Sequence, residues 1–129
     1  MTDTVTIRNG ATRLDIRLEK VHEWLMPQWK AAMKLMRLGG WLNTEAVDSL
    51  ESWFPEAARD AAADLKDAQK AYNASYRSLK EVPKDRRESQ KYLNLSLYTA
   101  VRDARQKEER IKRRYLEFLA AKADMKKEN

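Results

Sequence analysis

The fold is decided by residues 55–81, which read PEAARDAAADLKDAQKAYNASYRSLKE. Small and apolar residues recur here at alternating three- and four-residue spacing, in the heptad pattern of a helix that packs against a second helix. They are Ala58, Ala61, Leu65, Ala68, Tyr72, Ser75 and Leu79. Because most of these side chains are small, the two helix axes can approach closely, and we expect the partner helix nearby in the chain.

A tight connection follows at residues 82–85, since the residue before Pro83 disfavours helix and Asp85 can cap a new one. The next helix is predicted over 84–126, with a matching seam. Its members are Leu97, Val101, Ala104, Glu108, Ile111, Tyr115 and Phe118. Folding the chain at Pro83 places five pairs together, which are Tyr72 with Leu93, Ala68 with Leu97, Leu65 with Val101, Ala61 with Ala104, and Ala58 with Glu108. The sequence therefore predicts a long antiparallel helix hairpin.

The beginning of the chain is predicted to hold an extended arm and a first helix. Residues 1–10 alternate apolar and polar side chains up to an Asn9-Gly10 turn, which indicates the arm. Apolar residues at three-to-four spacing predict a helix over 12–38. Pro27 is expected to kink or break this helix, and Gly39 to end it.

Between these two parts, a short helix is predicted over 44–54, and Pro55 is expected to begin the next helix because proline at a first helical position loses no hydrogen bond. The last helix is longer than its partner, so its surplus from Ile111 to Leu119 is expected to cover the short helix. The predicted fold is all-α, a helical bundle built on the long hairpin, with three main helices plus one short helix in a single domain of 129 residues.

Composition excludes several classes of protein. The absence of cysteine excludes disulfides and thiolate metal sites. No apolar run approaches the ~20 residues that cross a bilayer, so we expect a cytoplasmic protein with no membrane contact. One Glu-x-x-His fragment, Glu19 with His22, lacks the second copy that helical di-metal sites need. We therefore expect no metal, no cofactor and no enzymatic activity.

The net charge of +6 favours acidic partners, and its distribution points to one region. Counting along the chain gives +3 for residues 1–42, −5 for 43–67, +4 for 68–91 and +4 for 92–129. The basic run over 102–114 contains acids four residues before its bases. An acidic row on the preceding helix, including Asp60 and Asp64, is expected to pair with Arg102 and Arg105. The bend of the hairpin has no such compensation.

The bend is therefore the favoured contact site for nucleic acid. Its predicted binding residues are Arg77, Lys80, Lys84, Arg86, Arg87 and Lys91. Tyr72, Tyr76 and Tyr92 lie among them, and cations beside aromatic rings can hold phosphates and stack on unpaired bases. The alternative is that these lysines merely keep the hairpin end soluble, with the tyrosines in the seam.

Two further groups are predicted to take part in binding. Lys30, Lys34 and Arg37 share one side of the first helix and could extend the basic surface of the bend. Trp24 and Trp41 lie beside charged residues and are predicted anchors for a protein partner, because tryptophan is enriched at interface hot spots.

These observations predict a non-catalytic helical binding subunit or accessory factor that contacts nucleic-acid backbone through the basic hairpin tip, within a larger nucleoprotein assembly. No base-reading module is visible, so little sequence discrimination is expected. The alternative is a protein-binding inhibitor or adaptor of phage or plasmid type. A third possibility is a coiled-coil assembly or scaffold protein, which would form homo-oligomers.

Overall fold

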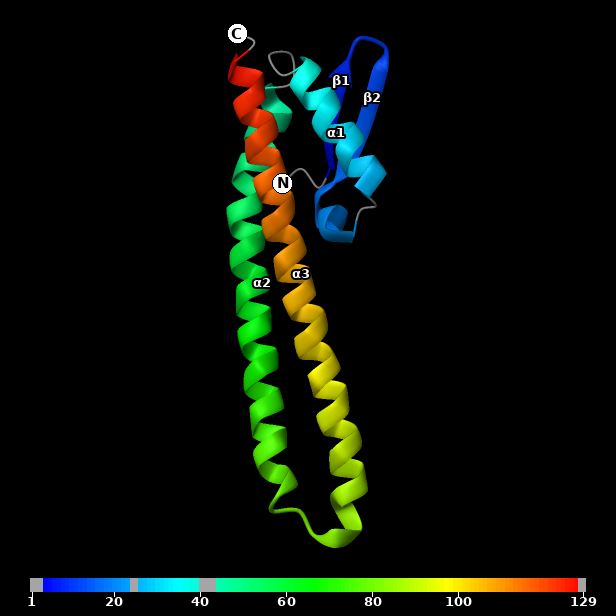
Figure 1. The fold of residues 1–129 in the computed structure, drawn as a ribbon, viewed down its shortest axis with the longest axis vertical. Helices are drawn as coiled ribbons and strands as arrows, with labels where there is room; N and C mark the ends of the chain where they lie inside the picture. The colour runs from blue at the N-terminus through cyan, green and yellow to red at the C-terminus, as the bar shows by residue number, and fades with distance from the viewer. Residues whose placement is uncertain (1–3, 24–25, 40–43, 128–129) are drawn as a thin grey trace. The chain divides into compact units, whose positions relative to one another are not determined.

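The computed structural model describes residues 4–23, 26–39 and 44–127 and divides the chain into two compact units. Unit 1 comprises Met1–Ala57 and Arg110–Asn129, and unit 2 comprises Ala58–Glu109. The elements in chain order are β1 (Thr4–Asn9), β2 (Thr12–Arg17), the 3-10 helix η1 (Leu18–Glu23), α1 (Met26–Gly39), α2 (Thr44–Leu79), the 3-10 turn η3 (Lys84–Arg86) and α3 (Arg87–Lys127) (Figure 1). Most described residues are helical, so the predicted all-α class is confirmed, while the single domain stays a prediction.

Unit 2 is the predicted helix hairpin, in which the end of α2 and the beginning of α3 run antiparallel (Figure 1). Ala61, Ser75 and Val101 are buried in its seam, and the other seam residues predicted within this unit are half-buried. A seam of small side chains leaves a thin apolar layer between two helices. Most of the surface of unit 2 is therefore exposed.

The predicted register of the hairpin is confirmed near the bend. Gln90 Nε2 donates hydrogen bonds to the backbone oxygen of Ser75 at 3.2 Å and to its Oγ at 3.1 Å. Tyr72 lies three residues before Ser75, and Leu93 lies three residues after Gln90. Tyr72 and Leu93 are the partners that the sequence predicted. Leu93 itself is 50% exposed, whereas Asn94 is half-buried, because Asn94 and not Leu93 continues the helical spacing from Gln90.

α2 runs through Pro55 without a break, so the predicted boundary between a short helix over 44–54 and a helix from 55 is wrong. Proline inside a helix removes one hydrogen bond and crowds the carbonyl of Glu51, at a cost of about 3 kcal/mol. Leu50 and Phe54 are both fully buried, one helical turn apart. Burying these two side chains contributes about 2 to 3 kcal/mol for each. This burial offsets the cost of the proline, so the helix continues through it.

The N-terminal segment forms an antiparallel β-hairpin of β1 and β2, which corrects the predicted helix over 12–38. Asn9 lies opposite Thr12, so the loop has two residues. Gly10 takes φ +60° and no other residue described has a positive φ, as in a type II′ turn with glycine at its first central position. Within the described residues, the predicted extended arm is therefore the strand Thr4–Asn9.

The strand period explains why the helix prediction failed here. Ile7 pairs with Leu14 and Val5 pairs with Ile16, and these side chains alternate with exposed or half-exposed polar ones. Val5, Ile7 and Ile16 are buried, while Leu14 also fits a helical stripe that continues to Leu18. Six residues are too few for period alone to separate strand from helix, and the turn at Gly10 decides the outcome.

α1 begins at Met26 and ends at Gly39, which confirms the predicted break near Pro27 and the glycine stop. One face of α1 contacts β1. Its buried side chains are Trp29, Ala32, Met33, Leu35 and Met36. These residues recur at helical spacing, so unit 1 has a conventional apolar core.

The core of unit 1 centres on Phe54. Its ring centroid lies 5.3 Å from that of Tyr115, 5.5 Å from that of Phe118 and 6.1 Å from that of Trp29. Arg114 is 6% exposed, donates from Nη1 to both carboxylate oxygens of Glu117 at 3.1 Å, and lies 5.7 Å from the centroid of the Trp29 ring. The predicted packing of the surplus of α3 on the residues before Pro55 is therefore confirmed.

Candidate nucleic-acid interface

The bend of unit 2 is a short, hydrogen-bonded connection between two helix ends. After α2, the amide of Lys80 donates to the Arg77 carbonyl at 3.3 Å, and the amide of Glu81 donates to the Ser78 carbonyl at 3.0 Å. The amide of Arg86 donates to the Pro83 carbonyl at 2.9 Å, closing η3. Because the backbone is held in this way, the side chains of the bend leave it from defined positions.

The six cations predicted at the bend all lie at the surface. We call them the tip cluster, and they are Arg77, Lys80, Lys84, Arg86, Arg87 and Lys91, each exposed. No ion pair joins any of them to another residue of the described ranges. Glu81, Asp85 and Glu88 in the same stretch are also exposed and leave an excess of three positive charges. The structure thus brings together the predicted residues, and they are accessible to an anion.

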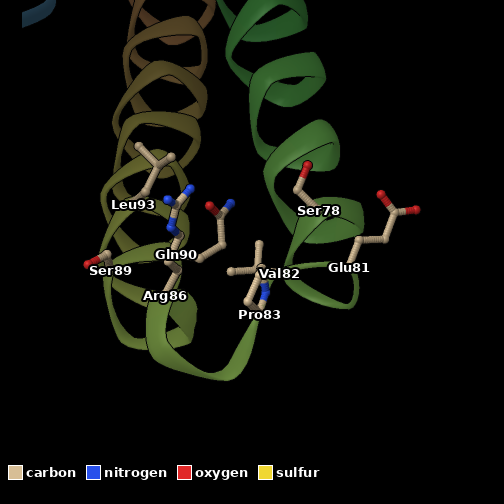
Figure 2. Close-up of a pocket in the computed structure, with 8 residues that line it drawn as sticks. All are labelled: Ser78, Glu81, Val82, Pro83, Arg86, Ser89, Gln90 and Leu93. Atoms are coloured by element: carbon tan, nitrogen blue, oxygen red, sulfur yellow. The ribbon is translucent and has the colours of Figure 1, made fainter.

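An open groove of about 610 Å³ lies between the two helix ends at the bend (Figure 2). Its lining residues are Ser78, Glu81, Val82, Pro83, Arg86, Ser89, Gln90 and Leu93. In Figure 2 the Glu81 carboxylate points away from the opposite wall, which is formed by Arg86 of η3 and Gln90 of α3. The Arg86 guanidinium therefore gives this wall hydrogen-bond donors suited to a phosphate oxygen, while the Gln90 amide donates to Ser75.

Three tyrosines form a connected group beside the tip cluster. The Tyr72 ring centroid lies 6.3 Å from that of Tyr76 on α2 and 5.8 Å from that of Tyr98 on α3. Tyr72 is half-buried, whereas Tyr76 is 50% and Tyr98 53% exposed. Tyr98 was missed from the sequence, although it directly follows the seam residue Leu97, as Tyr76 follows Ser75. Tyr92 is 69% exposed and lies on the side of α3 opposite the seam.

The predicted pairing of acids with arginines in the middle of the hairpin is wrong. Arg102 Nε lies 3.7 Å from its neighbour Asp103, and among the described residues neither Asp60 nor Asp64 forms an ion pair with Arg102 or Arg105. The reason is geometric. Asp60 and Asp64 each precede a seam residue, whereas the arginines each follow one, and in an antiparallel pair of helices these two sets lie on opposite sides of the seam.

Arg114, the last residue of the basic run over 102–114, does not lie at the surface. Its side chain is buried in unit 1 and bound to Glu117. A buried arginine of this kind serves the packing of the core and is not accessible to a ligand.

The second predicted basic group lies on α1, in unit 1. Lys30, Lys34 and Arg37 share one side of the helix and are all exposed. Arg37 Nε is 3.1 Å from an Asp124 carboxylate oxygen, so part of its charge is neutralised within the unit. That this group extends the basic surface of the bend stays a prediction. The predicted protein anchors, Trp24 and Trp41, lie outside the described residues.

Glu19 and His22, the two residues of the Glu-x-x-His fragment, each interact with a charged residue in η1 or next to it. Arg17 Nη2 donates to Glu19 at 2.7 Å, and His22 Nε2 lies 3.4 Å from a Glu23 carboxylate oxygen. The hydrogen bond from Lys20 and its charge lower the pKa of Glu23, with a smaller contribution from His22. Within the described ranges, no group of three or more histidines and acids is arranged to hold a metal ion.

Comparison with known proteins returns no relative. No family model matches the chain, and neither a curated protein nor a solved structure is significantly similar to it. Among the described helices, none is both apolar and long enough to cross a bilayer. Function is therefore inferred from the chemistry of the exposed surface.

Proposed function

We propose that this protein is a non-catalytic nucleic-acid-binding subunit or accessory factor that contacts backbone phosphates through the tip cluster, within a larger nucleoprotein assembly. The observation that carries this proposal is the group of six exposed cations around one bend, with no ion-pair partner among the described residues. Neutralising phosphates with such side chains releases counterions, which provides affinity without sequence discrimination.

The direct test is the salt dependence of binding to a generic duplex. Affinity should fall steeply as salt rises, and the triple variant Lys84→Glu, Arg86→Glu and Arg87→Glu should abolish binding at physiological salt. At lower salt, the slope of log affinity against log salt should become shallower by about 3 in the triple variant, close to one for each phosphate that is no longer neutralised.

A matched control carries the same change of net charge away from the bend. Lys70→Glu, Lys107→Glu and Arg110→Glu change three exposed cations outside the tip cluster, the first two of them in unit 2. Equal loss of binding in both triple variants would contradict a site at the bend. Salt-independent association with one protein, together with no oligonucleotide binding, would instead favour a protein-binding inhibitor or adaptor.

A further inference from the structure

The two sides of the hairpin in unit 2 differ sharply in charge. A residue that follows a seam residue is rotated by about 100° around its helix, and in an antiparallel pair these residues from both helices lie on the same side. Two such residues, Tyr76 from one helix and Tyr98 from the other, both contact the ring of Tyr72. These ring contacts therefore identify one side of the hairpin.

We call the side that carries these rings the tyrosine face. Its members are Lys66, Gln69, Asn73 and Tyr76 on α2, Lys80 directly after α2, and Arg87, Lys91, Leu95, Tyr98, Arg102 and Arg105 on α3. They recur at three- and four-residue spacing, and every one is exposed. These residues include six cations and no acid; at the far end of the unit, Arg59 and Glu109 also follow seam residues and add one cation and one acid. The other side has Asp60, Asp64, Asp67 and Asp103 but a single base, Lys107.

The tyrosine face matches the chemistry of an unpaired nucleic-acid strand. Tyr76 and Tyr98 each leave about half of their surface to solvent, and the half-buried Tyr72 contacts both rings and holds them in place. Exposed rings stack on bases whose faces are free, and neighbouring cations hold the phosphates between them. A duplex hides its base faces within its own stack, so it gains nothing from the rings.

We propose that the tyrosine face binds a single nucleic-acid strand, with Tyr76 and Tyr98 stacking on unpaired bases and the six cations contacting the phosphates. The cations from Lys91 to Arg105 extend along about 21 Å of α3, at 1.5 Å per residue, which is enough for several nucleotides. This inference rests on the proposed function, because it names the kind of nucleic acid that the hairpin selects.

The test compares an oligothymidylate of about 20 nucleotides with a duplex of the same length, both fluorescently labelled, by anisotropy at low salt. The double variant Tyr76→Leu and Tyr98→Leu should bind the single strand roughly 10- to 100-fold more weakly and the duplex unchanged. Tyr76→Phe with Tyr98→Phe keeps both rings and should keep single-strand binding. Tyr92→Leu, which removes an exposed tyrosine opposite the seam, should change neither affinity.

The outcomes separate this inference from the proposed function. If the leucine variant binds the single strand as the unchanged protein does, or loses single strand and duplex equally, the tyrosine face is not a stacking surface. The tip triple variant still tests phosphate binding in that case. If the phenylalanine variant loses single-strand binding while circular dichroism shows an intact helix content, the rings do not act by stacking and the inference is overturned.

Discussion

Unit 1 and unit 2 use their side chains in opposite ways. In unit 1 the rings of Trp29, Phe54 and Phe118 are buried in contact, and an arginine is buried beside them. In unit 2, which the structure describes throughout, Ala61, Ser75 and Val101 are the buried residues. Hydrophobic stabilisation grows with the apolar area removed from water, so unit 1 contributes most of the stability. Unit 2 keeps most of its charged and aromatic side chains at the surface.

The largest expected effect tests where the stability resides. Phe54→Ala removes the ring at the centre of the aromatic cluster and should lower the free energy of unfolding by about 3 to 5 kcal/mol, because a buried cavity replaces it. Val101→Ala in the seam of unit 2 should cost about 1 to 2 kcal/mol, since it removes less apolar volume from a thinner layer. Urea denaturation followed by circular dichroism measures both, and equal losses would contradict the comparison.

An intermediate effect distinguishes the buried cation of unit 1 from an exposed one of unit 2. Arg114→Ala should lower the free energy of unfolding by about 2 to 3 kcal/mol, because it removes the partner of Glu117 and the cation beside Trp29. Arg102→Ala should change it by less than about 1 kcal/mol, since its ion pair with Asp103 is solvent-exposed. Thermal unfolding of the two variants measures the difference between their losses of stability. Equal losses would show that Arg114 behaves as a surface cation.

The smallest effect concerns an exposed carboxyl in the β-hairpin of unit 1. Thr6 Oγ1 donates to Asp15 at 2.7 Å, and this hydrogen bond, aided by Arg13, lowers the pKa of Asp15. A lowered pKa in the folded state stabilises the fold above the pKa of the unfolded chain, and this contribution is lost as pH falls through the folded value. Thr6→Val should raise the pKa of Asp15 in an NMR titration, whereas Thr12→Val should leave it unchanged. If the pKa of Asp15 is the same in Thr6→Val, the Thr6 hydroxyl does not stabilise the ionised carboxylate.

Much of the candidate site was predictable, because it depends on the helical spacing of the seam residues and on the single turn that joins the two helices. The tip cluster is contiguous around Pro83, so any hairpin that bends there gathers these cations. The tyrosine face was not predicted, since it depends on which residues follow the seam in two helices at once. Tyr98 lies in α3, far along the chain from Tyr76, and ring contacts with Tyr72 connect the two.

The sequence by itself determined the hairpin of unit 2, because a regular spacing of small residues over many turns leaves one helical face to bury. It also determined the register at Ser75 and Gln90, since the turn at Pro83 aligns the two seams. Tertiary packing alone decided that α2 continues through Pro55, where burial of Phe54 outweighs a lost hydrogen bond. For residues 12–17, the turn at Gly10 and the pairing with β1, which itself contacts α1, together outweigh the helical spacing of the apolar residues.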